Sequence, residues 1–189
     1  MDDLETPQTV VAGTQQWLER AVIGLNLCPF AKAVHVKGQI HYAVCDSSDA
    51  QTVLDQLEAE LLALQAADPE QRDTTLLIAP ALHPDFLDFN DFLAAADALL
   101  RRMKLAGVLQ IASFHPQFQF AGTEPDDITN YTNRAPYPIL HLLRECSLDR
   151  AVQAFPDAET IFEKNMQTLE DLGHAGWAAL DLHTPPSAL

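Results

Sequence analysis

Long apolar runs, cysteines and basic side chains are all scarce in this chain of 189 residues. No run approaches the roughly 18 apolar residues of a membrane-spanning helix. The three cysteines (Cys28, Cys45 and Cys146) lie far apart without a CxxC pair, which excludes a disulfide framework and favours a reducing cytoplasm. The 11 lysines and arginines face 27 acids, for a formal net charge of −16. This balance removes the usual electrostatic basis for binding nucleic acid or an anionic membrane. The acidic first residues lack a basic n-region, so we expect no secretory signal and a cytoplasmic protein.

Familiar catalytic motifs are missing as well. GxGxxG, P-loop and GxSxG patterns do not occur, which argues against the familiar nucleotide and serine-hydrolase sites. The HExxH spacing of a zinc site is also absent, so the metal signal is weak. No motif in the sequence indicates which cofactor, if any, the protein binds.

Hydrophobic periodicity predicts a single α/β domain over residues 1–189. Between residues 39 and 114 the order is strand, helix, strand, helix, strand, which favours parallel neighbours joined by right-handed crossovers. We therefore predict a three- to four-stranded, mostly parallel sheet packed with about five helices. A ferredoxin-like α+β arrangement is the alternative if residues 118–120 add an antiparallel strand.

Local signals set the expected boundaries. Thr6 and Pro7 suit an N-cap and a first-turn proline, while Gly107 and Gly173 are typical of helix ends. The expected strands span 33–45 (one strand, or two joined at Gly38), 74–79 and 108–114. The expected helices span 7–25, 47 or 48 to 67, 90–106, 138–146 and 157–172.

The segment 113–145 carries the densest group of polar side chains. About twenty of its residues show no hydrophobic period, and loops that long in a compact domain are usually functional or disordered. Its aromatic residues argue against disorder, and four prolines restrict its backbone. Its polar residues are His115, Asp126, Asp127, Asn130, Thr132, Asn133, Arg134 and His141. This composition predicts a binding or catalytic site.

Two histidines follow the two central strands, each before a proline. His83 comes after the strand at 74–79, and His115 comes after the strand at 108–114. Ligands of open α/β sheets bind outside the carboxyl ends of parallel strands, so both rings could reach a site there. The alternative is that His-Pro merely opens a loop. We predict that His115 hydrogen-bonds to a side chain from residues 126–141, and that its ring is protonated unless burial opposes the charge.

The acids, amides and arginine of the same segment allow two interpretations. Asp127 or Asp126 could orient a base or bind a cation, or start a helix or turn. Asn130, Asn133 and Arg134 could hold a carboxylate or phosphate. Alternatively, Arg134 pairs with one of the aspartates and the asparagines cap backbone groups.

His141 and Glu145 lie four residues apart on the expected helix at 138–146, so they would share one face. Such a pair could chelate a metal or form an oriented base, although a structural hydrogen bond would also explain His141. Cys28 follows the first helix, near a helix C-terminus that would not favour its thiolate. We interpret Cys28 as a buried structural residue, with reactivity as the lesser alternative.

Three segments, GLNLCPFAKA, FHPQFQFAG and PDDITNYTNRAPYPILHLLRE, resemble the bacterial domain-of-unknown-function family numbered 1415. The resemblance extends from Gln16 to about Phe155, and the last two segments are specific to it. It implies a cytoplasmic bacterial protein and carries over no activity or catalytic role. It also adds weight to Cys28-Pro29-Phe30 as a motif.

Three functional hypotheses remain. The first is an enzyme or binding domain for an anionic small metabolite, with His115, Asp127 and His141 as catalytic residues and Asn130, Asn133 and Arg134 as substrate-binding residues. The second is a metal-dependent hydrolase that uses His115, Asp126 or Asp127, and His141, with Glu145 or His83 as further ligands. The third is a non-catalytic binding or assembly protein whose loop is ordered by its own hydrogen bonds.

Overall fold

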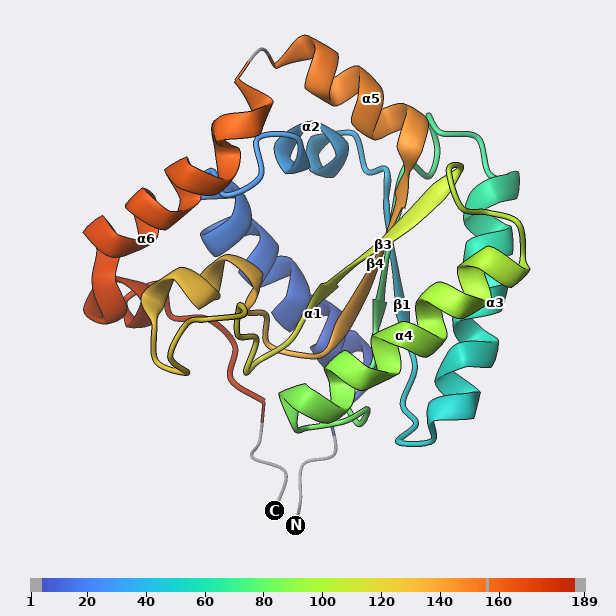
Figure 1. The fold of residues 1–189 in the computed structure, drawn as a ribbon, viewed down its shortest axis with the longest axis horizontal. Coiled ribbons are helices and arrows are strands. Elements are labelled where there is room, and N and C mark those ends of the chain that lie inside the picture. The colour runs from blue at the N-terminus through green and yellow to red at the C-terminus, as the bar shows by residue number, and fades with distance from the viewer. Residues whose placement is uncertain (1–4, 156, 186–189) are drawn as a thin grey trace.

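The computed structural model describes residues 5–155 and 157–185, which fold around one four-stranded sheet (Figure 1). The strands are β1 (Ile40–Val44), β2 (Thr74–Ile78), β3 (Leu109–Phe114) and β4 (Ile139–Arg144). Two helices, α3 (Ala50–Ala66) and α4 (Phe86–Arg102), cover one face of the sheet, and α1 (Pro7–Trp17) and α6 (Ile161–Ala178) lie on the other side. Two shorter helices, α2 (Ala31–Val36) and α5 (Glu145–Ala154), lie at the end where β1 and β2 begin. The α/β class is as predicted.

The sheet is mixed, in contrast to the mostly parallel sheet that the sequence predicts. Its strand order is β1-β2-β4-β3. Strand β1 is parallel to β2, whereas β4 is antiparallel to both of its neighbours. The last strand in the sequence is therefore inserted between β2 and β3. Residues 118–120 form no strand, so the addition on which the ferredoxin-like alternative depended does not occur there.

The expected helix at 138–146 is wrong, because residues 139–144 form β4 and the helix α5 begins only at Glu145. In β4, Leu140 and Leu142 point into the core beneath α3 and α4. Ile139 points to the opposite core beneath α1. Apolar residues on both faces are typical of a central strand, and over six residues they resemble a buried helix. His141 and Glu145 consequently do not share a helix face.

The expected strand over 33–45 is also only partly correct. Residues 31–36 form α2, and only Ile40–Val44 are in β1. Gly38 separates the two elements at φ 67°, a left-handed conformation that glycine adopts without strain.

Most other elements lie close to their predicted positions. Thr6 caps α1 through its side chain, as predicted, and the chain continues into a π-helix, η1 (Leu18–Ile23). Helix α4 begins four residues before the expected Asn90, because Asp85 accepts hydrogen bonds from the N–H groups of Leu87 and Asp88. Helix α6 continues beyond Gly173, which nevertheless interrupts its geometry at φ 63°.

No helix in residues 5–155 and 157–185 is long and apolar enough to cross a membrane.

Candidate functional site

The predicted site residues of the loop between β3 and β4 mostly bind the loop itself. Asn130 is fully buried. Its Oδ1 accepts from Phe120 N at 2.9 Å and Thr123 Oγ1 at 2.7 Å, and its Nδ2 donates to Glu124 O at 2.8 Å. Asn133 Nδ2 donates to Ser113 O at 3.2 Å. These amides satisfy backbone groups that would otherwise lack partners in a loop.

Asp127 lies at the start of the 3-10 helix η2 (Ile128–Asn133). Its Oδ1 accepts from the backbone N of Thr129 at 2.9 Å and from Thr129 Oγ1 at 2.7 Å. These hydrogen bonds, the backbone one first, lower the pKa of the Asp127 carboxyl. The carboxylate thus caps η2, as the simpler of the two interpretations expects.

Arg134 holds the loop through carbonyl groups. Its Nε donates to Phe118 O at 3.2 Å, its terminal nitrogen donates to Pro125 O, and its guanidinium lies 4.3 Å from the centre of the Tyr131 ring. Within the described residues Arg134 makes no ion pair with Asp126 or Asp127, so the pairing that the sequence left open as an alternative does not form.

His115 is fully buried and is held by backbone groups. Its Nδ1 accepts from Gln117 N at 3.0 Å, so Nε2 carries the proton and donates to His83 O at 3.0 Å. The expected bond to a side chain of residues 126–141 is wrong, although the backbone N–H of His115 donates to Asn133 O at 3.2 Å. Burial lowers the pKa of His115, so the ring is neutral. His83 contributes its carbonyl group, not its ring.

His141 lies on the opposite face of the sheet from His115. The His115 ring packs against Phe89 of α4, with ring centroids 5.0 Å apart, whereas the His141 ring lies 6.1 Å from that of Phe114, whose side chain faces the α1 core. Adjacent residues of a strand point to opposite faces, so Phe114 and His115 are directed apart. The sheet therefore separates two of the three predicted catalytic residues.

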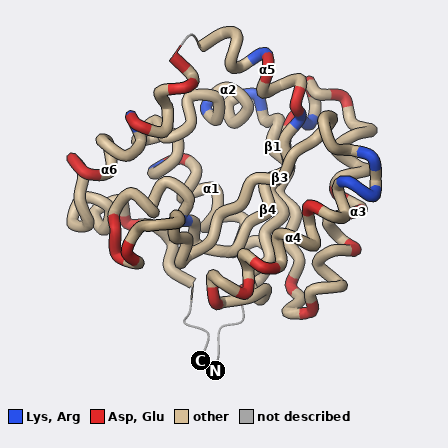
Figure 2. The backbone as a smooth tube through the Cα atoms, viewed as in Figure 1, with Lys and Arg blue, Asp and Glu red and all other residues tan. Residues whose placement is uncertain are grey.

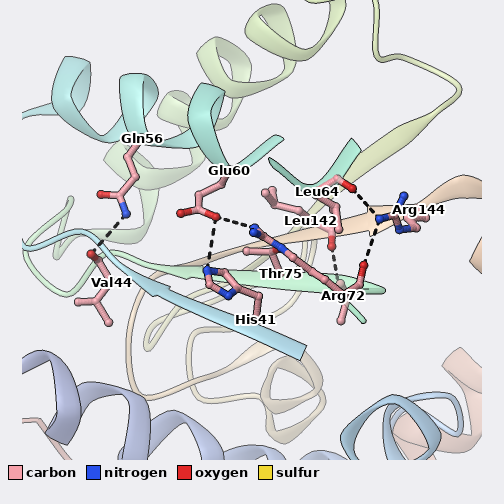
Figure 3. A network of polar contacts seen from close by, with 10 residues as sticks. His41, Val44, Gln56, Glu60, Leu64, Arg72, Thr75, Leu142 and Arg144 are labelled. Atoms are coloured by element: carbon pink, nitrogen blue, oxygen red, sulfur yellow. Dashed lines mark hydrogen bonds and ion pairs between the residues drawn. The ribbon is translucent and has the colours of Figure 1, made fainter. Parts of the chain in front are cut away.

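A network at the β1 edge includes residues that the sequence analysis did not single out (Figure 3). Glu60 Oε2 pairs with a terminal nitrogen of Arg72 at 2.6 Å, and His41 Nε2 approaches the same oxygen at 3.7 Å. Arg72 Nε donates to Thr75 Oγ1 at 3.0 Å. Its carbonyl accepts a hydrogen bond from Arg144 at 3.0 Å. This network fixes α3 against the sheet, so its charged groups are engaged in structure.

A pocket lies between α2, α5 and the sheet end where β1 and β2 begin. It encloses about 550 Å³ and is called the α2–α5 pocket below. Its apolar wall includes Pro29, Phe30, Val34, Leu143, Leu148 and Ala151. This end of the sheet is opposite to the carboxyl ends of β2 and β3, where the sequence analysis placed the site.

Charged groups surround this apolar wall. Lys37, Arg144 and Arg150 line the pocket, which is three of the 11 lysines and arginines, against Glu70 and Asp73 from the 27 acids. Figure 2 shows basic positions on α2, on α5 and at the adjoining end of the sheet. The pocket is thus locally cationic in an acidic protein.

A polar chain crosses from the sheet to α5. Ser147 Oγ donates to Asp73 Oδ1 at 2.6 Å and accepts from Arg150 at 3.1 Å. One nitrogen of the Arg150 guanidinium is engaged in this way, which leaves most of its five N–H groups for a ligand.

His141 is the one predicted catalytic residue in the α2–α5 pocket. Its Nε2 lies 2.8 Å from Thr74 Oγ1, and that hydroxyl donates its only proton to Leu142 O at 2.6 Å. Nε2 must therefore carry the ring proton, and the lone pair is on Nδ1. Burial lowers the pKa of His141 to about 4, so the ring is neutral near pH 7.

Because His141 is neutral in the folded protein, we expect the protein to lose stability in acid. Because the folded pKa of about 4 lies below the reference value of 6.5, the unfolded state binds more protons between these values. The contribution of the His141 ring to the free energy of unfolding is complete above about pH 6.5. It falls as the pH drops towards 4, by about 2 kcal/mol after allowance for the partial exposure of the ring. We expect His141→Gln, which keeps a donor for Thr74, to flatten this dependence. Urea unfolding at a series of pH values measures it, and equal pH slopes for both proteins would contradict it.

Cys28-Pro29-Phe30, the motif from the resemblance, lines the same pocket. Cys28 precedes α2, so it faces a helix start rather than the helix end expected from the sequence. Burial raises the pKa of the Cys28 thiol, while the backbone N–H groups of Phe30 and Ala31 oppose that shift. The thiol is therefore protonated near neutral pH, as a structural cysteine would be.

The described residues contain no group of three or more His, Cys, Asp or Glu side chains placed to hold a metal ion. Residues 5–155 and 157–185 therefore offer no ligand set for the metal-dependent hydrolase hypothesis.

A family model described as "Protein of unknown function (DUF1415)" matches residues 9–179. The chain belongs to this family. Neither a curated protein nor a solved structure matches the chain. DUF1415 membership confirms the resemblance seen in the sequence and supplies no activity or ligand.

Proposed function

We propose that the α2–α5 pocket binds a small metabolite with an anionic group, a carboxylate or phosphate, and a largely apolar body. The observation that carries this proposal is the reversed charge balance of the pocket. Basic residues outnumber acidic ones in its lining, whereas acids dominate the whole chain by 27 to 11. A local cluster of cations in an acidic protein attracts an anion to that place.

Lys37 and Arg150 are the anion-binding residues in this proposal. Lys37 makes no ion pair within the part of the chain that the structure describes. Arg150 offers a planar set of donors that fits carboxylate or phosphate. Arg144 is less suited, because one terminal nitrogen already serves the three carbonyls of Leu64, Ala67 and Arg72.

The volume and wall of the pocket fit a small ligand. About 550 Å³ lies within the range of about 300–1,000 Å³ typical of ligand sites. The wall is mostly apolar, with a few polar groups, which is the usual composition of such sites. His141 Nδ1 is a neutral acceptor in this wall, and it could take a hydrogen bond or a proton from the ligand. In this proposal His115, Asp127, Asn130, Asn133 and Arg134 order the loop.

The test is titration with hexanoate, hexyl phosphate, hexylamine and hexanol, followed by calorimetry or NMR. We expect hexanoate or hexyl phosphate to bind and hexylamine to bind poorly. Lys37→Ala and Arg150→Ala each weaken binding of the anion by about fivefold, and together by about 20-fold, since a partly exposed ion pair contributes about 1 kcal/mol.

Lys32→Ala provides the matched control. Lys32 is exposed on α2, the helix that Lys37 follows, and does not line the pocket. The Lys32→Ala substitution removes the same charge from the protein, so its effect on the affinity for the anion should stay within about twofold. Equal losses from Lys32→Ala and Lys37→Ala, or tighter binding of hexylamine than of either anion, would refute the proposal.

A further inference from the structure

The α2–α5 pocket adjoins a second, smaller cavity, here called the inner cavity. The inner cavity encloses about 50 Å³. Five residues line both spaces: Cys28, Ala31, Val34, Thr74 and His141. The two spaces therefore meet at a shared wall, which these five residues form between α2 and the sheet.

The inner cavity is apolar and lies between the first helical segment and the sheet. Its remaining walls are Trp17, Leu18, Val22, Ile40, Leu76 and Phe114. Protein interiors are close-packed, with few voids, so an apolar space beside an open pocket is a feature to explain. Its volume has room for about two methyl-sized groups, taking about 30 Å³ for each as for a water molecule.

The helix that forms one wall has unusual geometry. Leu18 and Val22 belong to the π-helix η1, which covers Leu18–Ile23. Its hydrogen bonds span five residues, from Gly24 N to Glu19 O at 3.0 Å and from Leu27 N to Val22 O at 2.9 Å. π-Helical turns are rare and occur frequently at functional sites, because they displace side chains from positions that an α-helix would impose. This wall supports a ligand-binding role independently of the pocket's charge.

We infer that the ligand is an amphipathic acid whose apolar end extends past the shared wall into the inner cavity. This inference rests on the proposed function and adds the shape of the ligand to it. The anionic group lies near Lys37 and Arg150 in the outer part of the pocket. The hydrocarbon part lies along Pro29, Phe30 and Leu148, and its end contacts Trp17. Ligands of this class are alkyl carboxylates or alkyl phosphates.

A series of straight-chain carboxylates from butanoate to decanoate tests the inference. Affinity should rise by about fourfold for each methylene that enters apolar surroundings, and then level off when the inner cavity is full. A matching series of alkyl phosphates distinguishes the two anion classes by their absolute affinities.

Trp17 reports directly on the inner cavity. The chain has two tryptophans, and Trp177 lines neither space. In a Trp177→Phe protein, we expect the longer acids to shift the emission of Trp17, and butanoate to leave it unchanged. Acids that bind without any change in Trp17 emission would overturn the inference and leave the proposed function intact.

Two alanines of α2 provide matched variants. Ala31 lines both spaces, whereas Ala33 lines only the outer pocket. Ala31→Leu should block the inner cavity, so that affinity stops rising at a chain about two methylenes shorter. Ala33→Leu should keep the chain-length dependence of the unmodified protein. The same dependence in both variants would refute the inference, and no binding of any acid to the unmodified protein would refute the proposed function together with it.

Discussion

Replacing Arg144 by methionine is expected to lower the free energy of unfolding by about 3–5 kcal/mol. Arg144 is 8% exposed, and one of its terminal nitrogens donates to Leu64 O, to Ala67 O at 2.8 Å and to Arg72 O at 3.0 Å. The first two carbonyls belong to the end of α3, where the last backbone acceptors lack full partners within the helix, and Leu64 O also accepts a long hydrogen bond from Ala67 N at 3.3 Å. A cation also complements the negative end of the helix dipole. Methionine would fill much of the space but could not donate a hydrogen bond to any of the three carbonyls.

Arg150→Met is the comparison for this prediction. Arg150 is exposed on α5 and, within residues 5–155 and 157–185, donates only to Ser147, so its replacement should change stability by less than about 0.5 kcal/mol. Urea denaturation of both variants measures the difference. If Arg144→Met stays within about 1 kcal/mol of the unmodified protein, water reaches the α3 carbonyls and the capping argument fails.

His115→Leu is expected to cost about 2–4 kcal/mol. Leucine can replace the ring as an apolar filling against Phe86 and Phe89, whose ring centroids lie 5.6 and 5.0 Å from that of His115. It cannot replace the two hydrogen bonds of the ring. The N–H of Gln117 and the carbonyl of His83 would then be left unpaired, and the second of these lies in the connection between β2 and α4.

His83→Asn is the matched variant for this prediction. It retains the backbone carbonyl that His115 uses, and asparagine tolerates the left-handed conformation at φ 42°. We expect a loss below about 1 kcal/mol. Thermal melting distinguishes the two, since His115→Leu should lower Tm by roughly 5–15 °C for a domain of this size. Equal losses would show that the His83 ring, rather than the bond from His115, stabilises the connection.

Strong local signals made much of the fold predictable from the sequence. Residues 74–78 form a fully buried strand as expected, because a continuous apolar run bounded by polar residues suits a sheet centre. Strand β4 was not predictable in this way. ILHLLR follows a proline and fits both helical and strand patterns, and the choice is decided by β2 and β3, whose backbone groups lie open on either side. The choice between helix and strand for residues 139–144 thus depends on tertiary contacts and not on their own sequence.

The site was harder to predict for a related reason. Polar density marked the loop after His115, but Asn130 and Arg134 bind carbonyl and amide groups of that same loop. The sequence does not show which backbone atoms will lie beside a side chain. The α2–α5 pocket draws on three separate segments, within residues 28–39, 69–74 and 141–154, which bring Lys37, His141 and Arg150 together. Only His141 and the Cys28-Pro29-Phe30 motif gave a local signal for it.

The insertion of β4 also sets an order of assembly during synthesis. The β1–α3–β2 unit is complete once residue 78 has emerged, whereas β3 has no strand partner until residues 139–144 follow it. During that interval the nascent chain exposes one unpaired edge on β2 and another on β3, and such edges are sites of mispairing between chains. The strand that closes the sheet is thus the last strand to leave the ribosome, and a chain ending before it would have the β1–β2 pair and a β3 segment without a strand partner.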